Sequence, residues 1–472
     1  MPRERLIPLI VAVALFMENM DSTVIATALP AIAADIGTSP LALKLAITSY
    51  LLALAIFIPA SGWTADRFGA RTIFRAAIAV FMCGSIACAL AASLEHFVIA
   101  RFVQGIGGAM MTPVGRVVLL RSVDKRTLVA AMTCVTMPAL IGPLVGPPVG
   151  GFITTYFSWH WIFLINVPMG LLGIVLATRY IENIRADTPV PFDLAGMTLT
   201  GLGIGGLAFG LTVLGVDILP GSVVAGMIVA GAIFMAAYVL HARRTPAPIL
   251  DLSLFALPTF RASIVGGSVF RAGVGALPFL MPLMLQVGFH MTPFHSGLVT
   301  FSTALGAMSM KAAVPLILKR FGFRATLTVT AVIAGALVAA CGTFTPTTPI
   351  LVMVAVLGVG GFFRSLEFTS INTIAYADVD PPRISKATSI ASVAQQLATS
   401  MGVAVGALAV EASVHFRHGA TLTAEDFSTA FLFVGGFAAL SALVFVRLPP
   451  DAGAELANRT PVPTDPTDQR TG

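Results

Sequence analysis

The chain has 472 residues, of which 57% are hydrophobic and only 11% are charged. Soluble domains carry about 25% charged residues, so this composition excludes an ordinary soluble protein. The 44 glycines follow no regular period and the four cysteines show no paired spacing, which excludes a fibrous protein and a disulfide scaffold. We therefore predict a polytopic membrane protein.

The apolar residues come in runs of the length that a helix needs to cross a membrane, about 20 residues. We predict fourteen such spans near residues 7–28, 43–62, 72–93, 97–119, 129–154, 161–181, 194–214, 221–241, 262–284, 294–317, 324–344, 350–373, 387–412 and 428–446. The breaks between them are too short for a soluble domain. The last stretch, 449–472, is rich in Pro, Thr and Asp and is predicted to be a disordered cytoplasmic tail.

Basic residues predict the orientation of these spans. Most of the 28 Lys and Arg residues fall in the connections on the side of the N-terminus, whereas the opposite connections hold only Lys44 and Arg417. Cytoplasmic connections carry the excess of Lys and Arg, so both termini are predicted to be cytoplasmic. The net charge of +6 then reflects membrane topology and indicates no nucleic-acid partner.

A short motif occurs twice in the chain. The segment Arg67–Arg71 (Arg-Phe-Gly-Ala-Arg) returns 253 residues later as Arg320–Arg324 (Arg-Phe-Gly-Phe-Arg), and the same offset maps span 1 onto span 9. We predict an all-α polytopic fold of two six-helix bundles, with a linker that carries two extra transmembrane helices. Parallel repeats around a central cavity are typical of a rocking transporter, and fused repeats without a cavity are the alternative. The predicted parts are 1–182, the linker 183–255, 256–448 and the tail.

The loop between spans 2 and 3, Gly62–Arg71, resembles the Gly-x-x-x-Asp-Arg-x-Gly-x-Arg signature of the major facilitator superfamily. The resemblance implies a major-facilitator-type fold in which this loop latches the two halves together in one conformation. An ordinary basic turn is the structural alternative. The residues of the implied latch are Gly62, Asp66, Arg67, Gly69 and Arg71.

Further stretches resemble motifs of the same family. Arg101 and Gln104-Gly105 on span 4 resemble its proton-coupling motif, and 142–151 on span 5 resembles its exporter motif. The stretches 20–30 and 159–168 resemble motifs of the fourteen-span drug:proton antiporters, with Ala26 as a departure from the usual Asn. The exporter-motif residues are Gly142, Pro143, Gly146, Pro147, Gly150 and Gly151, and a close-packing helix face is their structural alternative.

Ionisable side chains inside the predicted spans are functional candidates, because charge at bilayer depth is costly. Asp21 on span 1 and Arg101 on span 4 lie at depths that a long Arg side chain can bridge. A buried carboxylate tends to bind a proton, whereas a nearby Arg favours its release. We predict Asp21, Arg101 and Glu18 as proton-coupling residues; a static ion pair is the alternative.

A second set of residues is predicted to line the substrate cavity: Glu367, Arg364, Arg271, Lys311 and Gln104. A structural ion pair between Arg364 and Glu367 is an equal alternative. For Arg116 and Glu411, nearer the span ends, we expect structural or snorkelling roles.

We therefore predict a secondary active transporter that exports small amphipathic, drug-like compounds across the bacterial inner membrane by proton antiport with alternating access. A metabolite-specific exporter or facilitator of the same family is the alternative, and a channel or receptor is the third class. No Walker motif, metal cluster or cofactor motif is present, so we expect neither an enzyme nor ATP as the energy source. The expected partners are the substrate, protons and the lipid bilayer. We expect a functional monomer and leave a periplasmic adaptor open.

Overall fold

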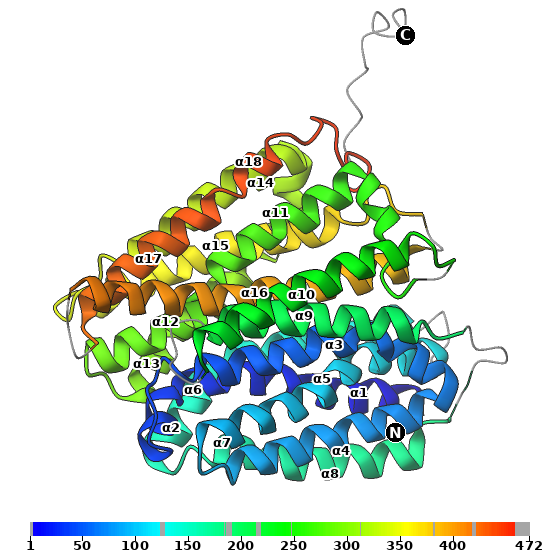
Figure 1. Cartoon of the computed structure of the whole chain (residues 1–472), viewed down its shortest axis with the longest axis horizontal. Helices are drawn as coiled ribbons and strands as arrows, with labels where there is room; N and C mark the ends of the chain where they lie inside the picture. Colours follow the sequence, from blue (N-terminus) through cyan, green and yellow to red (C-terminus); the bar gives the residue numbers. More distant parts are fainter. Residues whose placement is uncertain are drawn as a thin grey trace, which may run out of the picture.

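The computed structural model describes residues 3–122, 128–183, 185, 191–213, 219–246, 248–311, 313–380, 383–417 and 422–457. All regular elements within these ranges are helices (Figure 1). Twelve helices in the described part of the chain are long and apolar enough to cross a membrane. These findings confirm an all-helical, multi-pass membrane protein.

The first group of helices precedes residue 182 and forms one bundle, coloured blue to cyan in Figure 1. Within it α1 packs against α6 and α5, and α5 also packs against α3 and α4. Its elements are α1 (Arg3–Val24), η1 (Ile25–Thr27), α2 (Leu29–Asp35), α3 (Lys44–Phe68), α4 (Ala70–Ala89), α5 (Leu94–Ser122), α6 (Leu128–Tyr156), α7 (Trp161–Leu164) and α8 (Asn166–Tyr180).

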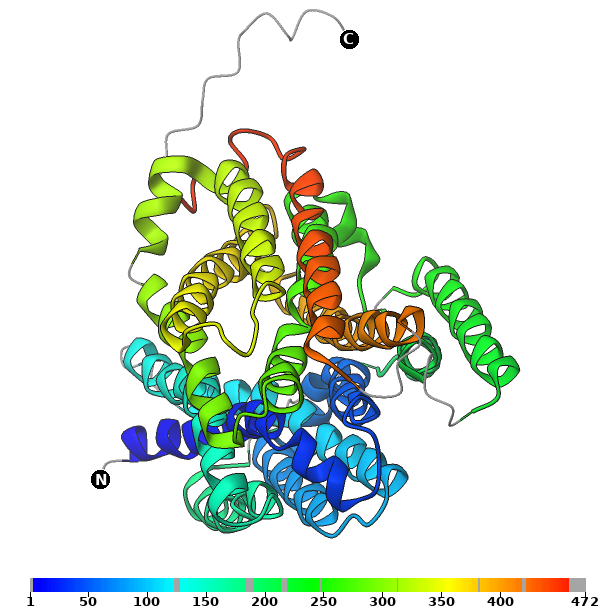
Figure 2. The same ribbon diagram turned by 90° about the vertical axis from the view of Figure 1, so that its left-hand side faces the viewer.

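The second group follows residue 257 and forms a second bundle on the other side of the molecule (Figures 1 and 2). In it α14 packs against α15 and α17, and α11 packs against α16 and α17. Its elements are α11 (Pro258–Val274), α12 (Leu277–Leu283), η3 (Met284–Gly288), α13 (Pro293–Met310), α14 (Val314–Cys341), α15 (Ile350–Ile374), α16 (Ile384–Phe416), α17 (Ala424–Ala439) and α18 (Ala442–Phe445).

The two bundles meet through helices that the repeat relates to one another. Helix α3 packs against α16, and α6 packs against α13. An offset of 253 residues carries α3 onto α13 and the start of α14, and it carries α6 onto α16. Each bundle therefore offers the same two helices to its partner, as expected for a two-fold arrangement of repeats.

Two further helices, α9 (Leu194–Val213) and α10 (Gly221–Ala242), lie beside this interface. Helix α9 contacts both α3 and α16, whereas α10 packs on the far side of α9. Figure 2 shows α10 as the green helix at the right edge of the molecule. A short helix, η2 (Leu252–Ala256), leads from this pair into the second bundle.

The structure shifts two of the predicted boundaries. Predicted span 294–317 ends at Met310, and α14 begins at Val314 and bends at Gly322. Predicted span 262–284 divides into α11, α12 and η3, where Pro278 and Pro282 fall within a short helix. The predicted spans 129–154 and 294–317 correspond to α6 and α13. These two are not among the twelve helices that were counted above as long and apolar enough to cross a membrane.

The repeated motif has the same backbone conformation in both copies. Gly69 has φ +96° between α3 and α4, and Gly322, the equivalent residue 253 positions later, has φ +74°. This left-handed region is open to glycine and strained for residues with a Cβ. The two glycines therefore permit the same sharp turn at the same place in each half.

We predict that Gly69→Ala lowers the free energy of unfolding by roughly 1–2 kcal/mol, because alanine is strained at positive φ. The matched control is Gly226→Ala on α10, where nothing lies within 4 Å of an added Cβ and φ is not positive. Thermal or SDS unfolding of the purified protein measures both. Equal stability of the two variants would contradict the role given to the turn.

Candidate functional site

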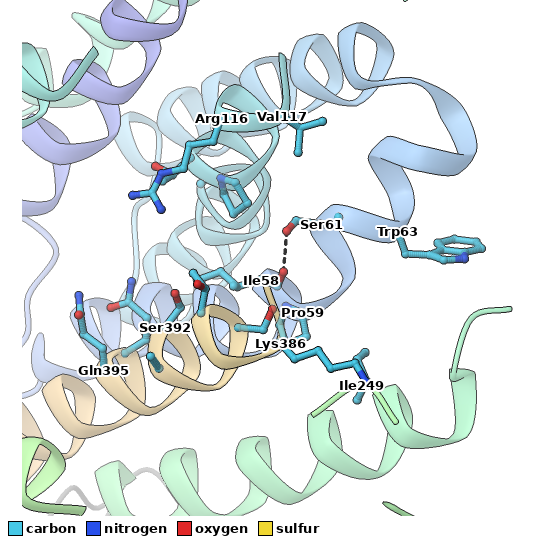
Figure 3. A pocket seen from close by; sticks show the side chains of 18 of the residues that line it. Ile58, Pro59, Ser61, Trp63, Arg116, Val117, Ile249, Lys386, Ser392 and Gln395 are labelled. Carbon is cyan, nitrogen blue, oxygen red and sulfur yellow. Dashed lines mark hydrogen bonds between the residues drawn. The ribbon is translucent and has the colours of Figure 1, made fainter. Parts of the chain in front are cut away.

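A cavity of about 1070 Å³ lies between the two bundles. Its walls come from α1, α3 and α5 on one side and from α11, α15 and α16 on the other, with linker residues 191–193 and Ile249 beside them. Figure 3 shows Arg116 on one wall and Ser392 and Gln395 of α16 on the other, all directed into the same space. A cavity shared by two repeats is a suitable substrate site for a transporter.

Some charged groups in this cavity already have partners. Asp193 pairs with His241 at 2.7 Å and accepts hydrogen bonds from the Gly196 and Ile249 amides. Partial burial alone would raise the pKa of Asp193, but these hydrogen bonds outweigh it and lower that pKa. Lys386 lies 3.5 Å from Asp251 at the cavity mouth. These pairs fasten the linker to the ends of α10 and α16.

Asp21 and Arg101 form the ion pair that the sequence predicts, with 2.7 Å between Oδ2 and the guanidinium. The other Asp21 oxygen, Oδ1, accepts from Gln104 at 2.9 Å and from Asn166 at 2.8 Å. Ser85 accepts from the same two amide groups, and Arg101 also stacks on Tyr50, 4.4 Å from the ring centre.

We call the five residues Asp21, Ser85, Arg101, Gln104 and Asn166 the Asp21 network. All are at most 1% exposed, and none lines the cavity. Gln104 therefore belongs to this network, although the sequence placed it in the cavity. Asn166 and Ser85 were missed, even though Asn166 falls within one of the family-like motifs.

Glu18 lies one helical turn before Asp21 but has a different environment. It lines the cavity and accepts a hydrogen bond from Thr112 at 2.7 Å. The two carboxylates of α1 therefore lie in different environments: Glu18 faces the cavity, and Asp21 is buried among hydrogen-bond partners.

In the second bundle, Arg271 is the predicted residue that lines the cavity. Its guanidinium donates to Asn372 at 2.6 Å and lies 5.5 Å from the centre of the Phe368 ring. Glu367 is fully buried and accepts from Thr330, while its Oε1 has no hydrogen-bond partner among the described residues.

The remaining predicted cavity residues lie elsewhere. Arg364 is 7% exposed and Lys311 is exposed at the end of α13; neither is among the residues that line the cavity. Within the described residues, Arg364 and Glu367 are not within 4.0 Å of each other as an ion pair. The structure therefore brings only Arg271 of this set to the cavity.

The predicted latch lies at the cavity mouth. Gly62 and Asp66 line it, Arg67 is exposed, and Gly69 forms the turn described above. Arg71 donates to the carbonyl of Ile181 at 3.3 Å, a contact within the first bundle.

The Trp63 ring lies 4.5 Å from that of Phe192, which ties the linker to the end of α3. Because residues 191–193 also line the cavity, the linker forms part of its mouth.

The exporter motif forms a close-packing face. A Cβ at Gly146 would lie 2.1 Å from Thr23 Oγ1, and one at Gly150 would lie 2.4 Å from the Val24 carbonyl. Gly142 faces α1 in the same way, so α6 lies directly against the backbone of the helix that carries Glu18 and Asp21. Further along α6, past the helical turn that contains Pro143, Gly151 faces Pro293 of α13, and Pro147 faces Gly297. The motif therefore packs against both bundles.

The end of the bundles away from the cavity mouth is closed by contacts between the halves. Lys44 at the start of α3 pairs with Glu411 near the end of α16, with 2.9 Å between Nζ and Oε1. Gln286 donates to the Thr27 carbonyl at 2.9 Å, and the Phe294 amide donates to Thr155 at 3.1 Å. The cavity is therefore closed at the end opposite Trp63 and Lys386.

In the ranges that the structure covers, no group of three or more His, Cys, Asp or Glu residues is arranged to hold a metal ion.

We predict that Lys44→Glu opens the closed end, because it places two carboxylates together where an ion pair lay. Removing one partner of a buried ion pair costs roughly 3–5 kcal/mol. Because Glu411 is partly exposed, we expect the free energy of the closed end to rise by about 2 kcal/mol. Spin labels at Leu90 and Phe416, both exposed at this end of opposite bundles, would report a longer distance.

The double variant Lys44→Glu with Glu411→Lys serves as the control, since it restores opposite charges. It should return the label distance toward that of the unmodified protein. A distance unchanged in Lys44→Glu would show that this pair does not hold the end closed.

Comparison with known proteins places the chain in a family. A model of the Major Facilitator Superfamily matches residues 11–195 and 263–468. The chain is 38% identical to the "Putative multidrug resistance protein MdtD" of Pectobacterium atrosepticum, over 94% of this chain and 95% of that protein. It is also 38% identical to the protein of the same name from Salmonella paratyphi B, over 94% of each.

Solved structures share the fold at low sequence identity. A D-xylose-proton symporter matches with a TM-score of 0.67 and 15% identity, over 95% of this chain and 98% of that chain. A bacterial homologue of the human lysosomal transporter Spinster, described as inward-facing, matches with a TM-score of 0.65 and 15% identity, over 98% and 99%. The chain belongs to the major facilitator superfamily and is a membrane transporter rather than an enzyme.

Proposed function

We propose that this protein exports small compounds across the bacterial inner membrane by proton antiport with alternating access. One observation carries this proposal: the two bundles enclose a cavity that is closed at one end and has a carboxylate, Glu18, on its wall. The curated relatives are named as multidrug resistance proteins, which supports export and drug-like substrates. A metabolite-specific exporter is the second candidate, favoured by the polar side chains of α16 that line the cavity.

We propose fourteen spans, with α6 and α13 added to the twelve helices that meet the length and apolarity test. Helix α6 has 29 residues and α13 has 18, and they pack against each other between the bundles. The proposed division keeps bundles at 1–182 and 256–448, a two-helix linker at 183–255 and a tail at 449–472. A monomer is the proposed functional unit, and a periplasmic adaptor is a further proposed partner.

This topology places both termini in the cytoplasm. The basic residues Arg67, Arg71 and Lys386 then lie on the cytoplasmic side, as expected from the excess of Lys and Arg in cytoplasmic connections. The cavity mouth lies at the same end, which supports an inward-facing state whose outer end is closed by Lys44 and Glu411. The latch residues are proposed to join the halves when this mouth closes.

Proton coupling is assigned to Glu18, Asp21 and Arg101. Glu18 faces the cavity and can exchange protons with water there, whereas Asp21 is held by Arg101, Gln104 and Asn166 in this state. In the outward-facing state, Asp21 is proposed to receive the incoming proton as its contact with Arg101 loosens. The proton then reaches the inward cavity through Glu18, one helical turn away.

We predict that Glu18→Gln and Asp21→Asn abolish proton-driven efflux and retain substrate exchange, since neither amide can release a proton. Reconstituted vesicles with an imposed pH gradient and no ATP measure both activities for the same compound. Glu95→Gln is the matched control, because Glu95 is an exposed carboxylate at the start of α5.

Two outcomes would contradict the assignment. If both variants fold and show full proton-driven efflux, the Asp21–Arg101 pair has only a structural role, and Glu18 only lines the cavity. Undiminished transport after the pH and electrical gradients are abolished would refute antiport itself.

A further inference from the structure

The first helix of each bundle carries one charged residue into the cavity, at positions that the repeat relates. Glu18 lies on α1 and Arg271 on α11, 253 residues apart, which is the offset between the two copies of the repeated motif. The two walls of the cavity therefore carry side chains of opposite charge at equivalent positions of the repeat.

Two positive charges of the cavity, Arg271 and Arg116, have no ion-pair partner among the described residues, and Glu18 attracts Arg116 from a longer distance. Across the described part of the chain, no carboxylate oxygen lies within 4.0 Å of Arg271 or of Arg116. Glu367 attracts Arg271 from beyond that distance. By contrast, Asp193 is paired with His241, and Lys386 with Asp251. Besides Asp66 at the mouth and the paired Asp193 and Lys386, the charged residues that line the cavity are Glu18, Arg116 and Arg271, which are two bases and one acid.

The guanidinium of Arg271 is held in a fixed position. Asn372 accepts one of its hydrogen bonds, and the Phe368 ring lies beside it. Gly267 leaves room for it, because a Cβ at that position would lie 2.8 Å from the second guanidinium nitrogen. Arg271 lines the cavity and is 7% exposed, and its guanidinium has further donors besides the one that Asn372 accepts. A fixed guanidinium with free donors matches the geometry of a carboxylate.

The wall beside Arg271 includes several hydroxyl and amide groups. Ser392, Gln395 and Gln396 of α16 line the cavity at helical spacing, so they share one face. Figure 3 shows Ser392 and Gln395 on the wall opposite Arg116. Such groups hydrogen-bond a polar ligand and offer little apolar surface to a hydrophobic cation.

We propose that the transported compounds are small organic anions whose carboxylate binds Arg271, with Arg116 and the α16 amides holding a second polar group. This inference deepens the proposed export function, since it names the substrate class of the same cavity. A site where unpaired bases outnumber unpaired acids attracts anions.

Binding to the purified full-length protein in nanodiscs, without any gradient, tests the proposal. The probes are succinate and benzoate, their neutral analogues succinamide and benzamide, the cation benzylammonium, and the zwitterion 4-(aminomethyl)benzoate. Calorimetry should detect the two anions and neither the neutral analogues nor the cation. The zwitterion should bind no more tightly than benzoate.

Variants connect this binding to Arg271. Arg271→Gln should weaken anion binding at least about tenfold, because one charge-assisted hydrogen-bonded contact is lost. Arg271→Lys keeps the charge and should recover part of the affinity. Arg261→Gln is the matched control, since Arg261 is exposed on the same helix and loses the same charge.

Four results would overturn the proposal: no anion binding, equal binding of the neutral analogues, anion binding unchanged in folded Arg271→Gln, or tighter binding of the zwitterion. The last result would assign Glu18 to a ligand ammonium group. Each leaves proton antiport untouched, because binding is measured without a gradient. A protein that binds anions but does not couple them to protons would instead contradict only the proposed transport mechanism.

Discussion

A charged side chain inside a membrane protein needs partners from the protein itself, and the Asp21 network shows how this chain meets that need. One carboxylate is held by a guanidinium and two amide groups, all of them buried. Removing one partner from such a buried pair costs roughly 3–5 kcal/mol. The network therefore fixes how α1, α4, α5 and α8 pack in the first bundle. Because the network holds the Asp21 carboxylate in place, Glu18 is the carboxylate of α1 that faces the cavity.

The second bundle arranges its buried charges differently. Three of its buried charges, Arg271, Arg364 and Glu367, are not joined as ion pairs among the described residues. A fourth, Asp426 at the start of α17, pairs with Arg417 at 2.7 Å. One bundle thus holds a compact network, while the other presents a guanidinium to the cavity. Since the helices themselves follow one repeat, the difference lies in the side chains. We infer that the first bundle handles protons, and that Arg271 of the second bundle recognises the substrate together with Arg116 of the first.

The sequence predicted the features that depend on local pattern. The apolar runs located the helices, the repeated motif located two glycines with positive φ, and helix depth paired Asp21 with Arg101. Features that depend on helix rotation were harder to predict. Lys311 was expected in the cavity but is exposed, and Gln104 was expected there but lies in the network. An error of a few residues at a helix end, as in span 294–317, turns a side chain toward another neighbour.

Contacts between the two bundles could not be predicted from the sequence. Lys44 and Glu411 lie 367 positions apart, and no sequence pattern indicated that one would neutralise the other. Lys44 was read only as a charge in a connection, and Glu411 as a residue near a span end. Their pairing depends on how the two bundles dock, which is set by α3 against α16 and α6 against α13. The same docking decides which polar residues of α16 reach the cavity.

The central claim is that substrate and protons move in opposite directions through one cavity. Vesicles that contain a pH-sensitive dye, with no pH gradient and the membrane potential clamped, test it most directly. A gradient of a transported compound, imposed alone, should drive protons across the membrane in the opposite direction until a pH difference builds up. Substrate movement that leaves the internal pH unchanged would contradict the account.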